Sequence, residues 1–184
     1  MHEELSKTLG IESYRKLPTL QVDSRRKGAT QPSWLDGACT SSSMDTDTAQ
    51  VTPLELTTKM MAAAVAAGAT LKVGAGVTGM SVDGAGNATS VTLATGEVVQ
   101  CDKVVVAMGP WSCQLEDWLS DGTKVPMTGI KSTSVVYDHA AAQQKVKAEP
   151  YALFCGEDKN GCHLEVYPRP ATTSAPPCAP APAD

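Results

Sequence analysis

The sequence predicts an α/β fold, and three observations support that prediction. A capped helix occupies residues 52–68, short alternating strands joined by turns follow at 77–100, and a β-branched run at 103–107 leads to Gly109. Alternating strands separated by turn residues are typical of antiparallel hairpins. A continuous valine-rich run is typical of a strand covered on both faces, as in a parallel sheet. The expected fold therefore combines helices with both kinds of strand pairing.

Length and composition limit the chain to one modest core. It has 184 residues, of which 42% are hydrophobic and only 4% aromatic. The formal net charge is -5 and Lys and Arg form no block, which argues against nucleic acid as a partner. No apolar run reaches the roughly 18 residues of a membrane span. The acidic segment 1–6 lacks the apolar core of a secretory signal, so we expect a cytoplasmic protein.

The 6 cysteines are expected to be reduced thiols, because no secretory signal indicates an oxidising compartment. Cys155, Cys162 and His163 form the one cluster, and it lacks the paired four-ligand spacing of a zinc site. We therefore predict no metal site. A disulfide-rich secreted domain is the alternative, and titration of 6 free thiols would exclude it.

The N-terminal segment, residues 1–50, is predicted to be weakly organised. Glu3 to Leu9 suggests a short helix and Leu20 to Asp23 a strand. Ser24 to Met44 is polar and contains several turn residues, so it is expected to form a long loop.

Clear order is expected to begin at Thr52. The sequence Thr52-Pro53-Leu54-Glu55 is a capping box, in which Thr52 and Glu55 would each accept an amide of the first helical turn. Pro53 falls at the first helical position, where its missing N–H has no cost. Alanines make this helix narrow enough to pack close to a neighbour, and Gly68 is a typical residue to end it.

Beyond Gly109 the expected elements are shorter. They are a helix at 112–119, a strand at 130–137, a helix at 140–146, and strands at 151–155 and 164–167. From residue 171 onward Ala and Pro dominate, so residues 171–184 are predicted to be disordered.

The stretch from Gly74 to Gly79 matches G-x-G-x-x-G, the sequence of a dinucleotide-binding turn. That turn works between a strand and a helix, whose N-terminus receives the pyrophosphate. Here the following residues, 80–84, alternate and turn at once. We therefore interpret the motif as a glycine-rich bend that enters a strand.

The order of several sequence pieces resembles FAD-dependent oxidoreductases of the D-amino-acid-oxidase-like superfamily, which includes glycine and sarcosine oxidases and dehydrogenases. The likeness covers about residues 10–170. Its pieces are Trp34-Leu35-Asp36, Gln50-Val51-Thr52-Pro53 before the Ala-rich helix, Gly68-Ala69-Thr70-Leu71, the strand through Val77, Ala107-Met108-Gly109-Pro110-Trp111-Ser112, Ala152-Leu153-Phe154 and Glu165-Val166-Tyr167-Pro168-Arg169-Pro170.

The resemblance implies a partial FAD/NAD(P)-binding three-layer domain at 51–125 and part of an antiparallel substrate-domain sheet at 126–170. It also implies oxidation of an amine or amino acid by hydride transfer to FAD. Family members begin with a strand, a G-x-G-x-x-G turn and a helix, which residues 1–50 lack. They also continue past the Pro-Arg-Pro segment, so the chain resembles the middle of such a protein. An unpaired strand at 103–107 would then make it marginally stable.

The resemblance assigns FAD contacts to Val77, Ala107, Met108 and Gly109, with Trp111 beside them. Gly109 would follow a strand at the carboxyl edge of a parallel sheet, where ligands bind in open α/β folds. Because glycine has no Cβ, the main chain can touch a ligand there. On the residues alone, a simple loop turn at Gly109 and a core valine at Val77 are the favoured alternative; the resemblance shifts the preference to the cofactor.

Arg or Tyr side chains are expected to hold a substrate carboxylate, since flavin enzymes supply orientation and charge to the cofactor's chemistry. Tyr167 and Arg169 are the chosen pair, because two positions apart on one strand they would share a face. The other candidates are Tyr137 and Tyr151. The alternative is that Tyr167 packs at a sheet edge and that Arg169 faces Glu165 or solvent.

Other titratable residues are expected to be structural. His139 and His163 are interpreted as surface residues, and Asp45 and Asp47 as solvated carboxylates. Two functions remain open: an incomplete flavin-dependent oxidoreductase acting on amines or amino acids, and a truncated domain that binds no flavin and acts, if at all, as an interaction module.

Overall fold

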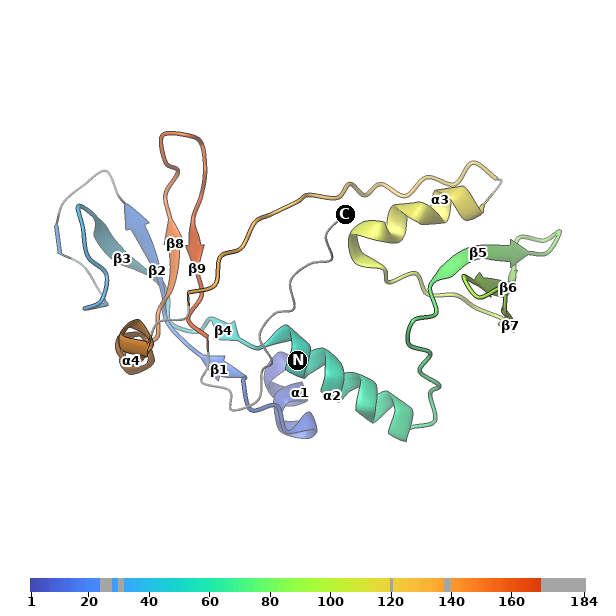
Figure 1. The fold of residues 1–184 in the computed structure, drawn as a ribbon, viewed down its shortest axis with the longest axis horizontal. Coiled ribbons are helices and arrows are strands. Elements are labelled where there is room, and N and C mark those ends of the chain that lie inside the picture. Colours follow the sequence, from blue (N-terminus) through green and yellow to red (C-terminus); the bar gives the residue numbers. More distant parts are fainter. Residues whose placement is uncertain (24–27, 30–31, 120, 138–139, 170–184) are drawn as a thin grey trace. The chain divides into compact units, whose positions relative to one another are not determined.

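The computed structural model describes residues 1–23, 28–29, 32–119, 121–137 and 140–169 (Figure 1). The helices are α1 (His2–Leu9), α2 (Pro53–Ala66), the 3-10 helix η1 (Gly109–Gln114), α3 (Leu115–Trp118) and α4 (Ala140–Ala148). The strands are β1 (Arg15–Lys16), β2 (Thr19–Asp23), β3 (Thr40–Asp45), β4 (Ala49–Gln50), β5 (Val77–Val82), β6 (Ala88–Leu93), β7 (Val98–Gln100), β8 (Ala152–Cys155) and β9 (Glu165–Val166).

Contacts between Cα atoms divide the chain into two compact units. The first unit contains residues 1–69 together with the part of the chain from Tyr137 onward, and the second contains Thr70–Val136. The tail at 171–184, predicted to be disordered, lies outside the described residues, as does His139. The α/β class expected from the sequence is observed, because both units combine helices and strands.

The first unit is built on a mixed four-stranded sheet with the order β3-β2-β8-β9. Strands β2 and β8 are parallel, with Leu20 opposite Leu153, whereas the other pairs are antiparallel. Figure 1 shows the blue β2 beside the orange β8, although they come from opposite parts of the sequence. Leu20, Val22, Cys39 and Leu153 form the core cluster of this unit. The sheet therefore joins the two ends of the described chain around one small core.

The N-terminal segment is more ordered than its sequence predicts. The expected helix and strand are confirmed as α1 and β2, but residues 40–45 form β3 instead of the end of a loop. This segment also supplies three of the four residues of the core cluster. The serine-rich β3 has no strand-like pattern of its own; it forms because β2 offers it an antiparallel ladder.

The helix predicted at 52–68 is confirmed as α2, but its capping box is not. Gly68 adopts φ +101° and donates to Val65 O at 3.0 Å, so it ends the helix as expected. At the start, the Thr52 side chain makes no cap hydrogen bond. The Thr52 amide instead donates to Ser13 Oγ at 2.9 Å. A tertiary contact therefore replaces the local cap.

Glu55 does not form the predicted capping box. Its side chain instead connects α2 to the residues that follow α1. Its carboxylate accepts the amides of Glu12 at 2.8 Å and Ser13 at 2.9 Å. Lys59 lies 3.2 Å from the same carboxylate and donates to Gly10 O. Hydrogen bonding from Ser13 and from the Glu12 amide lowers the pKa of Glu55 to about 2. These bonds anchor the N-terminal turn of α2 in the first unit.

Most of the surface of α2 is not covered by other described elements, so its alanines and larger apolar side chains are not buried. The structure buries none of its residues, and Leu54, Met60, Met61 and Val65 are between 43% and 58% exposed. Among the described elements, α1 is the one that contacts α2. The close packing expected from the small side chains is therefore absent from the described part of the chain.

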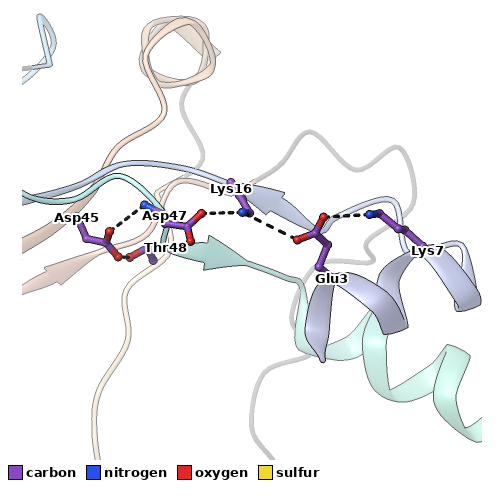
Figure 2. A network of polar contacts seen from close by, with 6 residues as sticks. All are labelled: Glu3, Lys7, Lys16, Asp45, Asp47 and Thr48. Carbon is purple, nitrogen blue, oxygen red and sulfur yellow. Dashed lines mark hydrogen bonds and ion pairs between the residues drawn. The ribbon is translucent and has the colours of Figure 1, made fainter.

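A chain of polar contacts runs over the surface of the first unit (Figure 2). Lys16 lies 2.6 Å from Asp47 and 3.9 Å from Glu3, and Lys7 lies 3.0 Å from Glu3. Asp45 accepts the amide of Asp47 at 2.9 Å. All these side chains are substantially exposed, so each contact adds little to stability. The network does link α1, β1 and the turn between β3 and β4.

The second unit contains the antiparallel sheet β5-β6-β7, which confirms the alternating strands predicted at 77–100. Asp83 closes the turn between β5 and β6 by accepting the amides of Ala85 at 2.9 Å and Asn87 at 2.8 Å. Helix α3 packs against β5. The sequence pattern was sufficient here because every strand pairs with its neighbour in the chain.

Two strand predictions in the second unit are wrong. Neither the valine-rich run 103–107 nor the segment 130–137 forms a strand. Val105 is 88% exposed and Ile130 is 90% exposed. A strand needs a partner for its amides and carbonyls, and within the described residues neither segment is paired. Of the strands expected at 126–170, those near 151–155 and 164–167 form as β8 and β9, and they pair with each other and with β2. The three-layer domain and the substrate-domain sheet stay predictions.

We predict that Glu55→Ala destabilises the protein by about 1–3 kcal/mol, because two amides of the first unit lose their acceptor. Chemical denaturation followed by far-UV circular dichroism measures this change. The matched control is Glu97→Ala, whose exposed carboxylate pairs only with Lys72 in the described residues. Equal losses in both variants would contradict the role given to Glu55.

The stability supplied by Glu55 also has a defined pH dependence. Its pKa is about 2 in the folded chain and 4.5 in the reference state, so the folded state favours the ionised carboxylate. This contribution is complete above about pH 4.5 and is lost as the pH falls toward 2. Comparing the denaturation of wild type and Glu55→Ala at pH 7 and pH 3 tests this, since the difference between them should shrink at pH 3.

Candidate functional site

The glycine-rich stretch 74–79 does not form a phosphate-binding turn. Gly74 adopts φ +69°, and β5 begins at Val77. The carbonyl of Gly76 accepts the Ala94 amide at 2.7 Å, which continues the pairing of β5 with β6. The interpretation of this motif as a bend that enters a strand is confirmed.

Gly109 forms a sharp turn at the start of η1. Its φ is +55°, in the left-handed region that favours glycine. An added Cβ at Gly109 would meet no atom within 4 Å, so its outer side is open. The turn is closed by the Trp111 amide, which donates to Met108 O at 3.2 Å. The Met108 amide in turn donates to Ser112 Oγ at 3.2 Å, so Ser112 stabilises the turn from inside η1. The helix expected at 112–119 therefore begins earlier, as η1, and continues as α3.

The residues that lead to this turn are extended and alternate in exposure. Val104, Val106 and Met108 are half-buried, whereas Val105 and Ala107 are exposed. This alternation is that of an extended chain with one covered side. Ala107 is therefore on the exposed side of a segment that belongs to no sheet among the described residues.

All five candidates for FAD contacts lie in the second unit. Val77 is half-buried at the start of β5, opposite Leu93, and Trp111 is 64% exposed in η1. Helix η1 contacts α3, and α3 packs against β5, but among the described elements η1 and β5 do not contact each other directly. The structure therefore links the turn at Gly109 to the strand of Val77 only through α3.

The substrate candidates lie in the first unit, and the prediction that they share a strand is wrong. Strand β9 ends at Val166, so Tyr167 and Arg169 both follow it. Both side chains are exposed, and Tyr167 donates to Glu165 Oε2 at 2.5 Å. This hydrogen bond raises the pKa of Tyr167 to about 12. The Tyr167 ring also meets Phe154 edge-on with ring centroids 6.0 Å apart.

A residue that sequence reasoning missed anchors this segment. Arg15 donates from Nη2 to Pro168 O at 2.7 Å, and from Nε and Nη2 to Gln50 Oε1 at 3.2 and 3.1 Å. Gln50 and Pro168 both belong to the pieces that carry the family resemblance. The resemblance therefore marked Gln50 and Pro168 as residues of interest. Nothing in the sequence indicates that Arg15 contacts both of them.

The remaining candidates are arranged as surface or packing residues. Tyr137 is 85% exposed, Tyr151 packs against the core cluster, and His163 is exposed. Asp45 and Asp47 are solvated, as expected.

The described part of the chain contains free cysteines and no membrane-spanning helix. The five cysteines there are unpaired: Cys39, Cys101, Cys113, Cys155 and Cys162. No group of three or more His, Cys, Asp or Glu in these residues could hold a metal ion. None of the described helices has the length and apolarity needed to span a membrane.

Comparison with protein families shows which family the chain belongs to. The family model of FAD dependent oxidoreductases matches residues 2–173 of the 184. The chain therefore belongs to the FAD-dependent oxidoreductase (DAO) family, which confirms the resemblance drawn from the sequence. No curated protein and no solved structure matches it.

The described residues leave the main chain at Gly109 open to a ligand. The open turn at Gly109 offers main chain free of a side chain, as contact with a ribose or diphosphate requires. The pyrophosphate itself is usually received by a helix N-terminus after a glycine-rich turn. In the described residues the one G-x-G-x-x-G sequence enters β5 instead.

We predict that Gly109→Ala destabilises the chain by about 1–2 kcal/mol, because its left-handed φ is costly for residues with a Cβ. Thermal denaturation provides the measurement. Gly84→Ala is the matched control in the same unit, since Gly84 also has open space around it but no left-handed φ. The assignment of a strained turn fails when both variants lose the same stability.

Proposed function

We propose that the chain binds FAD and takes part in oxidising an amine or an amino acid. Membership of the FAD-dependent oxidoreductase family supports the redox chemistry and the cofactor. The single observation on which the site depends is the open, left-handed turn at Gly109. In this proposal the main chain of Val77, Ala107, Met108 and Gly109 contacts the adenosine side of FAD, with Trp111 flanking it.

The chemistry that FAD would supply when bound is acceptance of the hydride from the carbon next to the substrate nitrogen. The chain's own groups bind and orient. At Gly109 the missing Cβ lets the peptide approach a ribose or diphosphate, which a larger side chain would block. The exposed Trp111 indole offers an apolar surface beside the turn.

Tyr167 and Arg169 are proposed to bind the carboxylate of an amino-acid substrate. A guanidinium pairs with a carboxylate through parallel N–H···O bonds, and Arg169 is exposed and able to do so. A tyrosine phenol is protonated at neutral pH, so Tyr167 can donate a hydrogen bond. Its present acceptor is Glu165, which would have to share this proton with a substrate.

FAD titration of the purified full chain tests the cofactor site. We expect quenching of flavin fluorescence and a stoichiometric visible flavin spectrum. Gly109→Val should weaken binding by at least about tenfold, because a branched Cβ fills the open side of the turn. Gly84→Val is the control and should bind like wild type.

A folded chain that stays colourless and leaves flavin fluorescence unchanged would contradict this proposal. That result would instead support a domain that binds no flavin. The entry of the 74–79 motif into a strand is the observation that favours this second candidate.

A further inference from the structure

Arg15 is an unusual cation because its hydrogen-bond partners are neutral. Its guanidinium donates to two carbonyl oxygens, those of the Gln50 side chain and the Pro168 main chain. The side chain is partly buried, and this burial lowers the pKa of Arg15. No carboxylate among the described residues forms an ion pair with it. Directional hydrogen bonds, and not an ion pair, therefore compensate the cost of partly burying the Arg15 guanidinium.

The guanidinium is fixed before it reaches Pro168. Arg15 and Gln50 are opposite each other in the β1–β4 pair. Gln50 Oε1 accepts from both Nε and Nη2, so one edge of the planar fork is held in register. The Nη2 group is thereby aimed at the Pro168 carbonyl at 2.7 Å. A lysine has a single ammonium and could not hold both partners in this planar geometry.

The hydrogen bond from Arg15 reaches a residue beyond the end of β9. Strand β9 stops at Val166, and Pro168 is buried two residues later. Proline has no N–H, so its carbonyl is its one main-chain hydrogen-bonding group. Among the described residues, Arg15 is the partner of that carbonyl. The anchored peptide therefore lies between Tyr167 and Arg169, and it limits where both exposed side chains can point.

We infer that Arg15 is a positioning residue, which fixes Tyr167 and Arg169 for binding an amino-acid carboxylate by holding the carbonyl between them. This inference rests on the proposed function, because the proposed function assigns the carboxylate to these two residues. Arg15 itself does not touch the substrate in this arrangement. It acts through the main chain of Pro168.

The first test is hydrogen exchange of the full chain without FAD, followed by mass spectrometry. Arg15→Gln should raise the exchange rate of the peptide that contains Tyr167 and Arg169 by about tenfold, as expected for the loss of one charge-assisted hydrogen bond. Peptides from α2 should not change. Lys16→Gln is the matched control, since Lys16 is the neighbouring cation on β1 and contacts Glu3 and Asp47 instead. Unchanged exchange in Arg15→Gln would overturn the inference.

The second test separates positioning from a purely structural role. The probe is glycine, the smallest amino acid, and its Kd for the FAD-free full chain is measured by NMR titration. Arg15→Gln and Arg169→Gln should each weaken binding by about tenfold. The double variant should bind no more weakly than Arg15→Gln alone, because the loss of Arg15 already releases Arg169 from its position. Arg15→Lys should not restore binding.

The outcomes distinguish this inference from the proposed function. Additive losses, rescue by Arg15→Lys, or a wild-type chain that binds no glycine would each overturn the positioning role. A chain that binds glycine with the expected coupling but fails the FAD titration would retain the positioning role and contradict only the flavin site.

Discussion

The parallel pairing of β2 with β8 is the interaction on which the first unit depends. It places Leu20 against Leu153 and Val22 against Cys155, so that the beginning and the end of the described chain share one core. Strands β3 and β9 then add to the two sides of this pair. Without it, β3 would lose its template, and β9 would have no fixed place relative to Arg15 or Gln50. Every proposed contact of the substrate segment therefore follows from one long-range pairing.

The second unit obeys a different constraint, since its sheet is assembled only from sequential neighbours. Each hairpin is closed by local chemistry, such as the carboxylate of Asp83 accepting amides within its own turn. The chain that follows β7 has no such neighbour in the described residues, and the valine-rich run toward Gly109 is therefore extended but unpaired. Val105 in this unit, like the apolar residues of α2 in the first unit, is exposed among the described residues.

The candidate site shows the same division between local and distant contacts. The sequence indicated a turn at Gly109, because a Gly-Pro dipeptide after an apolar run is typical of a turn. It also rejected the 74–79 motif correctly, because the residues after it alternate. It could not find Arg15, whose role depends on Gln50 and on Pro168, a residue 153 positions away in the sequence. It also misplaced Tyr167 and Arg169 on a common strand, because β9 ends earlier than the apolar pattern suggested.

The sequence by itself determined the elements that local forces can fix: α1, α2 with its glycine end, the hairpins of the second unit, α4 and the cores of β8 and β9. It also determined the family, through the order of short pieces along the chain. Tertiary structure alone decided which segments form strands when the pairing partner is distant in the sequence. Strand β3 forms because β2 pairs with it, whereas the strand predicted at 103–107 does not form. It also redirected Glu55 from its own helix cap to the amides of Glu12 and Ser13. The physical reason is that strand pairing and buried amides require partners, and no pattern within a short window says whether a partner from elsewhere in the chain will be there.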